Sequence, residues 1–169
     1  MERAFGAWPK TGRAPTATPD LAAKPGNGLR VVVVHRPEAV QTVIRFYAPA
    51  PRYAAADRMS LQLLNTLLGG SFTSRLNQNL REKNGFTYGA RSGYSLAPAA
   101  GFFSAGANVK SEVTGAAIRE LMLELQRLGG GPGDITPAEV QKSQETLRTA
   151  IIGSYQGLRG ILEIGRAHV

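Results

Sequence analysis

Cysteine is absent from this 169-residue sequence, and histidine occurs only twice. The absence of cysteine excludes a disulfide framework and any zinc site built from thiolates. No apolar run approaches the roughly 18 residues of a membrane-spanning helix, so we expect no membrane span. The opening residues also lack the charged and apolar regions of a secretory signal. Hydrophobic residues make up 43% of the chain, which is too many for a disordered protein and predicts a packed core.

Basic residues outnumber acidic residues by 20 to 12, which gives a net charge of +8. Such an excess attracts anions without identifying one. Nucleic-acid binding is one hypothesis, and a steep salt dependence of DNA binding would support it. It is not favoured, because the basic residues neither cluster on one predicted helix nor alternate with aromatic residues. We therefore expect no nucleic-acid partner.

Three segments at the ends of the chain differ from its centre. Residues 1–8 are predicted to end a helix, and residues 9–28 contain four prolines and three glycines, which is typical of an extended linker. Residues 163–169 are the peptide that a common short-read sequencing adapter would encode in frame, so we hypothesise a non-native tail. Coding sequence homologous to relatives beyond Leu162 in the parent DNA would contradict this. The central domain is then predicted at residues 29–162 and is expected to be incomplete at its C-terminal end.

Hydrophobic periodicity predicts an α+β domain, with an antiparallel sheet and helices packed on one of its faces. The first two strands are expected to pair with each other, and the last two to form a hairpin. In the third strand, alternation places Tyr88, Ala90, Ser92 and Tyr94 on one face. The predicted strands span residues 29–34, 41–47, 87–94 and 102–109, and the predicted helices run from 57 to 68, 74 to 83, 111 to 128 and from 136 onward.

Two patterns are candidate binding motifs. The segment His35-Arg36-Pro37-Glu38-Ala39 resembles the start of an H-x-x-E-H zinc motif, but Ala39 replaces the closing histidine and Pro37 would break the helix. The other histidine, His168, lies in the suspected tail. No metal site is therefore expected in this chain, and His35 is interpreted as a turn residue at a strand end.

The glycines at 69 and 70 precede a predicted helix, where backbone N–H groups could hold a phosphate. Neither of the glycine patterns of nucleotide-binding loops is present. The favoured interpretation is a turn between two helices, with Ser71, Thr73 or Ser74 as the N-cap residue.

Arg81 and Tyr88 form a more informative pair. Arg81 lies in the last turn of a predicted helix, Gly85 reverses the chain, and Tyr88 lies on the following strand. Both side chains donate hydrogen bonds, so together they could hold a peptide carbonyl and stabilise the oxyanion that develops when water attacks it. The alternative is structural: an arginine that complements the helix dipole and a half-buried tyrosine of the sheet.

Two stretches of sequence resemble a known family. They are Leu67-Leu68-Gly69-Gly70-Ser71-Phe72-Thr73-Ser74-Arg75-Leu76 and Leu80-Arg81-Glu82-Lys83-Asn84-Gly85-Phe86-Thr87-Tyr88-Gly89-Ala90. Both are similar to the C-terminal domain of the insulinase, pitrilysin and mitochondrial processing peptidase family of zinc metallopeptidases. The similarity extends over residues 1–162, with residues 4–8 resembling the closing helix of the preceding zinc-binding domain.

The resemblance implies half of a clamshell whose other half carries zinc. Zinc and the general-base glutamate would belong to an N-terminal domain or a partner subunit with H-x-x-E-H, and this chain would bind no cofactor itself. Arg81 and Tyr88 would bind and polarise the carbonyl of a peptide substrate, and Gly89, Ser74 and Arg75 are assigned to substrate binding with them. An extended peptide would pair with a strand edge.

The function implied is therefore that of the substrate-binding half of a zinc metalloendopeptidase. Without H-x-x-E-H, the chain is not expected to hydrolyse peptide bonds alone. The alternative is a structural or scaffold subunit of the same fold, although the presence of both Arg81 and Tyr88 argues against it. We expect a bacterial protein, and both the periplasm and the cytoplasm stay open as its compartment.

Overall fold

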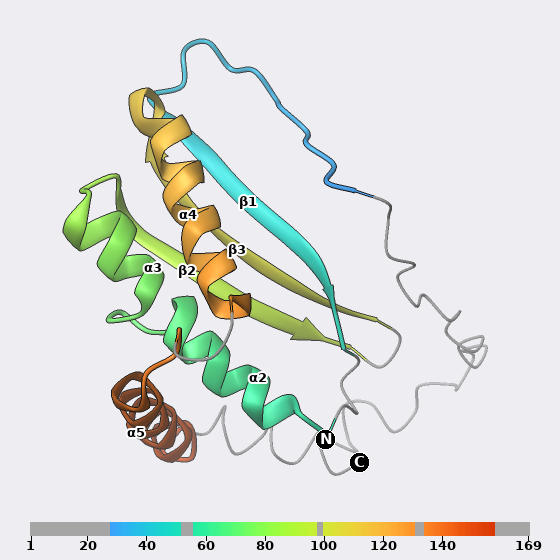
Figure 1. Ribbon diagram of the computed structural model, residues 1–169, viewed down its shortest axis with the longest axis vertical. Helices are drawn as coiled ribbons and strands as arrows, with labels where there is room; N and C mark the ends of the chain where they lie inside the picture. Colours follow the sequence, from blue (N-terminus) through green and yellow to red (C-terminus); the bar gives the residue numbers. More distant parts are fainter. Residues whose placement is uncertain (1–27, 52–55, 98–99, 131–133, 158–169) are drawn as a thin grey trace, which may run out of the picture.

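The sheet of this protein has three antiparallel strands, and the last of them in sequence lies in the middle (Figure 1). A computed structural model describes residues 28–51, 56–97, 100–130 and 134–157. The ladder joins the first strand to the third and the third to the second. The strands are β1 (Gln41–Ala50), β2 (Thr87–Leu96) and β3 (Gly101–Lys110).

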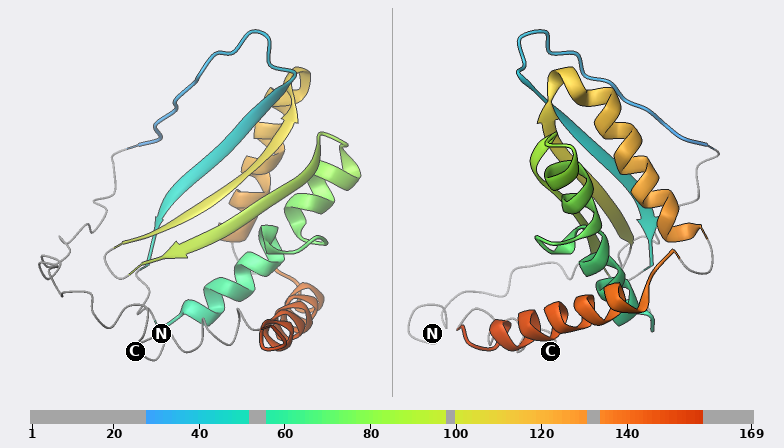
Figure 2. Two further views of the ribbon diagram at one scale, coloured as in Figure 1. Left: turned by 180° about the vertical axis from the view of Figure 1, so that it is seen from behind. Right: turned by 60° about the vertical axis from the view of Figure 1, so that its left-hand side comes forward.

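Helices cover one face of this sheet and leave the other face without a helix in the part of the chain that the structure describes (Figures 1 and 2). This arrangement confirms the predicted α+β class with helices on one side. None of the described helices is both long and apolar enough to span a bilayer. The helical segments are α2 (Arg58–Asn65) continuing into the π-helical turn η1 (Thr66–Gly70), α3 (Arg75–Asn77) continuing into η2 (Gln78–Lys83), the short 3-10 turn η3 (Ser111–Val113) leading into α4 (Thr114–Gly129), and α5 (Pro137–Ser154).

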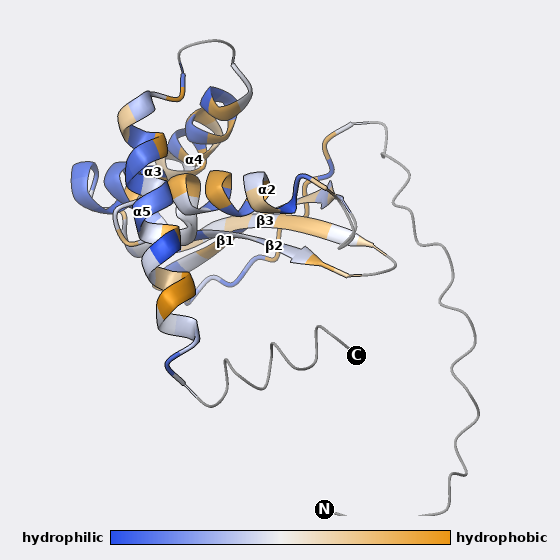
Figure 3. Ribbon diagram, turned by 90° about the horizontal axis from the view of Figure 1, so that it is seen from below, coloured by the Kyte–Doolittle hydropathy of each residue, from blue (hydrophilic) through white to orange (hydrophobic). Residues whose placement is uncertain are grey.

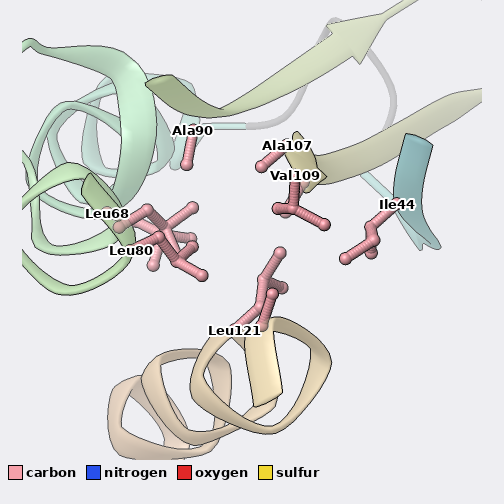
Figure 4. Packing of buried hydrophobic residues seen from close by; sticks show 10 residues of the cluster. Ile44, Leu68, Leu80, Ala90, Ala107, Val109 and Leu121 are labelled. Carbon is pink, nitrogen blue, oxygen red and sulfur yellow. The ribbon is translucent and has the colours of Figure 1, made fainter. Parts of the chain in front are cut away.

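The hydrophobic core lies between the sheet and the helices. Figure 4 shows the leucines of the helices facing small and branched residues of the strands. Ala90 and Ala107 are buried on the sheet, and their small side chains allow the helices to approach it closely. The largest fully buried side chains are Leu68, Leu76, Leu80, Leu121 and Val109.

The most C-terminal described helix, α5, packs on α2 and η1 rather than on the sheet. Its start confirms the predicted cap, because the Thr136 side chain accepts a hydrogen bond from the Glu139 N–H and the Glu139 side chain accepts one from the Thr136 N–H. The helix carries many hydrophilic residues (Figure 3), and only Ser143 is buried. By contrast, Asp57 precedes α2 as predicted but makes no capping hydrogen bond with its side chain.

The predicted strand at residues 29–34 is wrong, and so is its predicted pairing with residues 41–47. Residues 29–34 form no strand, and Val33 is 82% exposed. Four consecutive valines favour extended backbone, but a strand also needs a hydrogen-bonding partner. The pairing partner of β1 is β3, over the whole of Gln41–Ala50, and none of the described residues pairs with residues 29–34.

The other predicted strands and helices are present, with ends shifted by a few residues. Residues 1–27 and 158–169 lie outside the described part of the chain. The predicted helix end at residues 1–8, almost all of the linker at 9–28 and the suspected tail at 163–169 therefore stay predictions.

Candidate functional site

Tyr88 lies in a β-bulge near the start of β2. Thr87 pairs with Val109 and Ala90 pairs with Ala107, so three steps along β2 match two steps along β3. The extra residue changes the alternation of side chains between the two faces of the sheet. As a result, Tyr88 is 92% exposed, whereas Ala90 is fully buried in the core.

Because of the bulge, the side chains along β2 are not arranged as the sequence predicted. Strict alternation predicted that Tyr88 would share a face with Ala90, Ser92 and Tyr94. Ser92 does lie on the helix side, because its hydroxyl donates a hydrogen bond to the Asn65 side chain of α2. Tyr88 does not share that face, since one additional residue separates it from the regular part of the strand.

Asn77 holds the backbone at the bulge, and sequence reasoning missed it. This buried side chain of α3 accepts a hydrogen bond from the Ala90 N–H at 2.9 Å. Its amide group also donates to the Ser71 carbonyl and to the Ser74 hydroxyl. One feature of the sequence could have indicated this role: Asn77 follows Leu76 in a helix predicted to pack on the core. A polar side chain that is buried in such a helix requires a hydrogen-bond partner. Asn77 therefore positions the segment that carries Tyr88.

Arg81 lies at the end of η2, just before the chain reverses. Gly85 makes this reversal with a φ of +62°, and its N–H donates to the Arg81 carbonyl at 3.0 Å. The Arg81 guanidinium carbon lies 4.1 Å from the centre of the Phe72 ring, which is a cation–π contact. Its Nε atom is 3.6 Å from a carboxylate oxygen of Glu82. Its Nη1 atom is buried and has no hydrogen-bond partner among the described residues.

Arg81 and Tyr88 come from the two sides of one turn, as their sequence spacing predicted. No hydrogen bond joins their side chains within the described ranges, and the guanidinium rests on Phe72 instead. Their convergence on one carbonyl therefore stays a prediction about the peptide-bound state.

The other three residues assigned to substrate binding have different surroundings. Gly89 is exposed in the bulge beside Tyr88. Ser74 and Arg75 are only 2% and 8% exposed, and the Arg75 guanidinium is bonded to the carboxylate of Glu139. In this conformation a peptide can reach Gly89 but not Ser74 or Arg75.

A hollow of about 450 Å³ lies beside Tyr88 on the face of the sheet that the helices leave free. Its lining includes Tyr88 and Gly89 from the bulge, Arg91 from β2 and Arg45 from β1. The Arg45 guanidinium donates to the Ile44 carbonyl at 2.8 Å and to the Asn108 side chain at 3.3 Å. The hollow thus offers hydrogen-bond donors and positive charge at the end of the sheet where Tyr88 is exposed.

The described residues do not fit a zinc ion. They contain no group of three or more histidine, cysteine, aspartate or glutamate side chains that could hold a metal. His35 is exposed and precedes the turn at Pro37, but no described strand ends at it, so its predicted place at a strand end is wrong. His168 lies outside the described residues.

The sequence of this chain matches one known protein family. The family model described as the peptidase M16 inactive domain matches residues 1–147. This chain belongs to the peptidase M16 family. It corresponds to the C-terminal, inactive domain, as the two motifs around Arg75 and Arg81 predicted. No curated protein matches the chain.

Several solved structures share the fold of this chain. A peptidase M16 inactive domain from Pseudomonas fluorescens is 24% identical, with a TM-score of 0.60, over 65% of this chain and 26% of the other. A protease from Helicobacter pylori is 24% identical, with a TM-score of 0.64, over 77% of this chain and 31% of the other. The inactive peptidase domain of a candidate zinc protease from Bordetella parapertussis is 20% identical, with a TM-score of 0.59, over 77% of this chain and 69% of the other. The chain therefore spans less than a third of the first two proteins.

Proposed function

We propose that this M16 domain is the substrate-binding half of a zinc metalloendopeptidase. A zinc-bearing half, either an N-terminal domain of the same polypeptide or a partner subunit, would supply the metal and its ligands. The observation that carries the proposal is the β-bulge, which takes Tyr88 out of the core and exposes its phenol beside the hollow. A tyrosine with only a structural role in the sheet would gain nothing from 92% exposure.

The role proposed for Tyr88 and Arg81 is to bind the carbonyl oxygen of the scissile peptide bond. When water attacks this carbonyl, negative charge develops on its oxygen, and hydrogen bonds donated to it become stronger. The phenol supplies one donor and the guanidinium supplies others. The unpartnered Nη1 of Arg81 supports this role, because a buried donor without an acceptor is uncommon and a bound carbonyl would satisfy it.

In this proposal the Arg81 side chain turns from Phe72 toward Tyr88 when peptide binds. The side chain is one-third exposed, with 32% of its surface accessible, so it has room to move. A cation–π contact at a partly exposed site contributes only about 0.5–1 kcal/mol, which a charge-assisted hydrogen bond can replace.

Peptide hydrolysis by the chain combined with a zinc-bearing half tests the proposal. Tyr88→Phe and Arg81→Ala should each lower kcat by up to roughly 100-fold, the scale of one lost oxyanion donor. Matched controls are Tyr155→Phe and Arg148→Ala, whose side chains are exposed at the end of α5 and along it. Unchanged kcat in both site variants would overturn the proposal and would favour a scaffold subunit of the same fold.

A further inference from the structure

Two arginines flank a glycine in one row across the sheet. Arg45 of β1 and Arg91 of β2 both pair with Gly106 of the central strand β3. Residues directly opposite one another in a sheet point to the same face, and neighbouring strands lie roughly 5 Å apart, so the two arginine Cα atoms are about 10 Å apart. Gly106 has no side chain to fill the space between them. We call Arg45, Gly106 and Arg91 the arginine row.

The positive charge of the arginine row is unmatched on the sheet. None of the three strands contains aspartate or glutamate, while Lys110 adds a further cation four residues along β3 from Gly106, on the same face. Arg45, Arg91 and Lys110 are exposed, and none of them forms an ion pair with another described residue. A face with several cations and no carboxylate is complementary to an acidic ligand.

One of the two guanidinium groups is already oriented across the row. Arg45 bends over Gly106, because an added Cβ on this glycine would lie 3.1 Å from both the Cδ and the Nη1 of Arg45. Hydrogen bonds to the Ile44 carbonyl and to Asn108 hold it there. Arg91, on the other side, is exposed and free to close on a ligand. Guanidinium groups placed in this way suit a carboxylate, which accepts two parallel hydrogen bonds.

We propose that the arginine row binds the side-chain carboxylate of an aspartate or glutamate in the bound peptide. The inference rests on the proposed function, because Tyr88, Arg45 and Arg91 line the same hollow. A peptide whose carbonyl is held at Tyr88 would then be selected for an acidic residue a few positions from the scissile bond. This assigns the domain a preference for acidic peptides.

The size of the charged surface favours an acidic peptide over a nucleic acid. A nucleic-acid site follows several phosphates with a track of cations. Here the cations of the sheet are one pair across Gly106 and a single lysine at the strand end. The hollow beside them, about 450 Å³, has room for one or two side chains.

Fluorescence anisotropy with labelled peptides and the full chain tests this inference. The peptides would carry an acetylated N-terminus and an amidated C-terminus, and would differ only in having glutamate or glutamine at one position. A series that moves this position along the peptide covers the unknown register. We expect the best glutamate peptide to bind about fivefold more tightly than its glutamine partner, and the ratio to fall as salt is added.

Arg45→Gln and Arg91→Gln should each weaken binding of the glutamate peptide more than binding of the glutamine peptide, and so reduce this ratio toward one. Arg148→Gln on α5 removes the same charge away from the sheet and should leave the ratio unchanged. Equal binding of the two peptides at every position would overturn the acidic preference and leave the proposed function standing. Absence of binding to both peptides would overturn both proposals. Tighter binding of a single-stranded oligonucleotide than of any peptide would overturn the inference in favour of a nucleic-acid site.

Discussion

The Arg75 guanidinium and the Glu139 carboxylate form an ion pair with two parallel bonds, with Nε–Oε1 at 2.6 Å and Nη2–Oε2 at 2.9 Å. The pair joins the first turn of α3 to the first turn of α5. The same guanidinium donates to the carbonyl of Asp134, and Glu139 also accepts the capping bonds of Thr136. The start of α5 is thus fixed to the helical layer beside the Tyr88 bulge.

Arg75→Ala should destabilise the fold by roughly 3 kcal/mol, because the arginine side chain is 7% exposed and its removal leaves a carboxylate without its partner. The free energy of unfolding from urea titrations measures the effect. Arg148→Ala removes an exposed arginine of α5 and should change it by no more than about 0.5 kcal/mol. An equally small change in Arg75→Ala would show that the ion pair contributes nothing to stability.

Glu139 should also make stability depend on pH. Its hydrogen bonds with Arg75, followed by those with Thr136, lower its pKa from 4.5 to about 2. A lowered pKa in the folded state means that the contribution is fully present above pH 4.5 and is lost as the pH falls toward about 2. The difference in unfolding free energy between the wild type and Glu139→Gln should therefore be constant near neutral pH and shrink across that window. If the difference in unfolding free energy stayed constant down to the lower pH, the lowered pKa of Glu139 would be contradicted.

The elements that the sequence predicted correctly depend on local signals. The capping residues Thr136 and Glu139, the reversal at Gly85 and the leucine periodicity of α3 with η2 all act within a few residues, so they can be recognised without the fold. The wrong strand at residues 29–34 and the wrong face of Tyr88 both depend on partners. Extended backbone becomes a strand only when another strand lies beside it, and a bulge is defined by the register of two strands.

The buried ion pair was missed for the same reason. Nothing near Arg75 in the sequence indicates that a glutamate 64 positions away will pair with it. The arginine row likewise exists only through register, since Arg45 and Arg91 meet through their shared partner Gly106. Residue types and local spacing could identify Arg81 and Tyr88 as candidates, but not the surface on which Tyr88 lies.

The exposure of the valine run gives a direct test of the corrected fold. Val33→Ala should change the free energy of unfolding by less than about 0.5 kcal/mol, because this side chain is 82% exposed and has no strand partner. Val109→Ala makes the same change at a fully buried position of β3 and should cost about 2 kcal/mol. A comparable loss in both variants would mean that residues 29–34 pack as a buried strand after all.

A substitution at Asn77 should change the position of Tyr88 without altering the tyrosine itself. Asn77→Ala removes the acceptor of the buried Ala90 N–H and should destabilise the fold by about 1–3 kcal/mol, the cost of an unsatisfied buried donor. Gln78→Ala changes the neighbouring exposed amide of the same helix and serves as the control. Hydrogen exchange resolved at Ala90 would report the local effect, with much faster exchange in Asn77→Ala than in the control.

If Asn77 positions the bulge, peptide affinity should fall in Asn77→Ala even under conditions where the variant is fully folded, because Tyr88 is then no longer held beside the hollow. Unchanged exchange at Ala90 together with unchanged affinity would show that the strand keeps its bulge without this side chain.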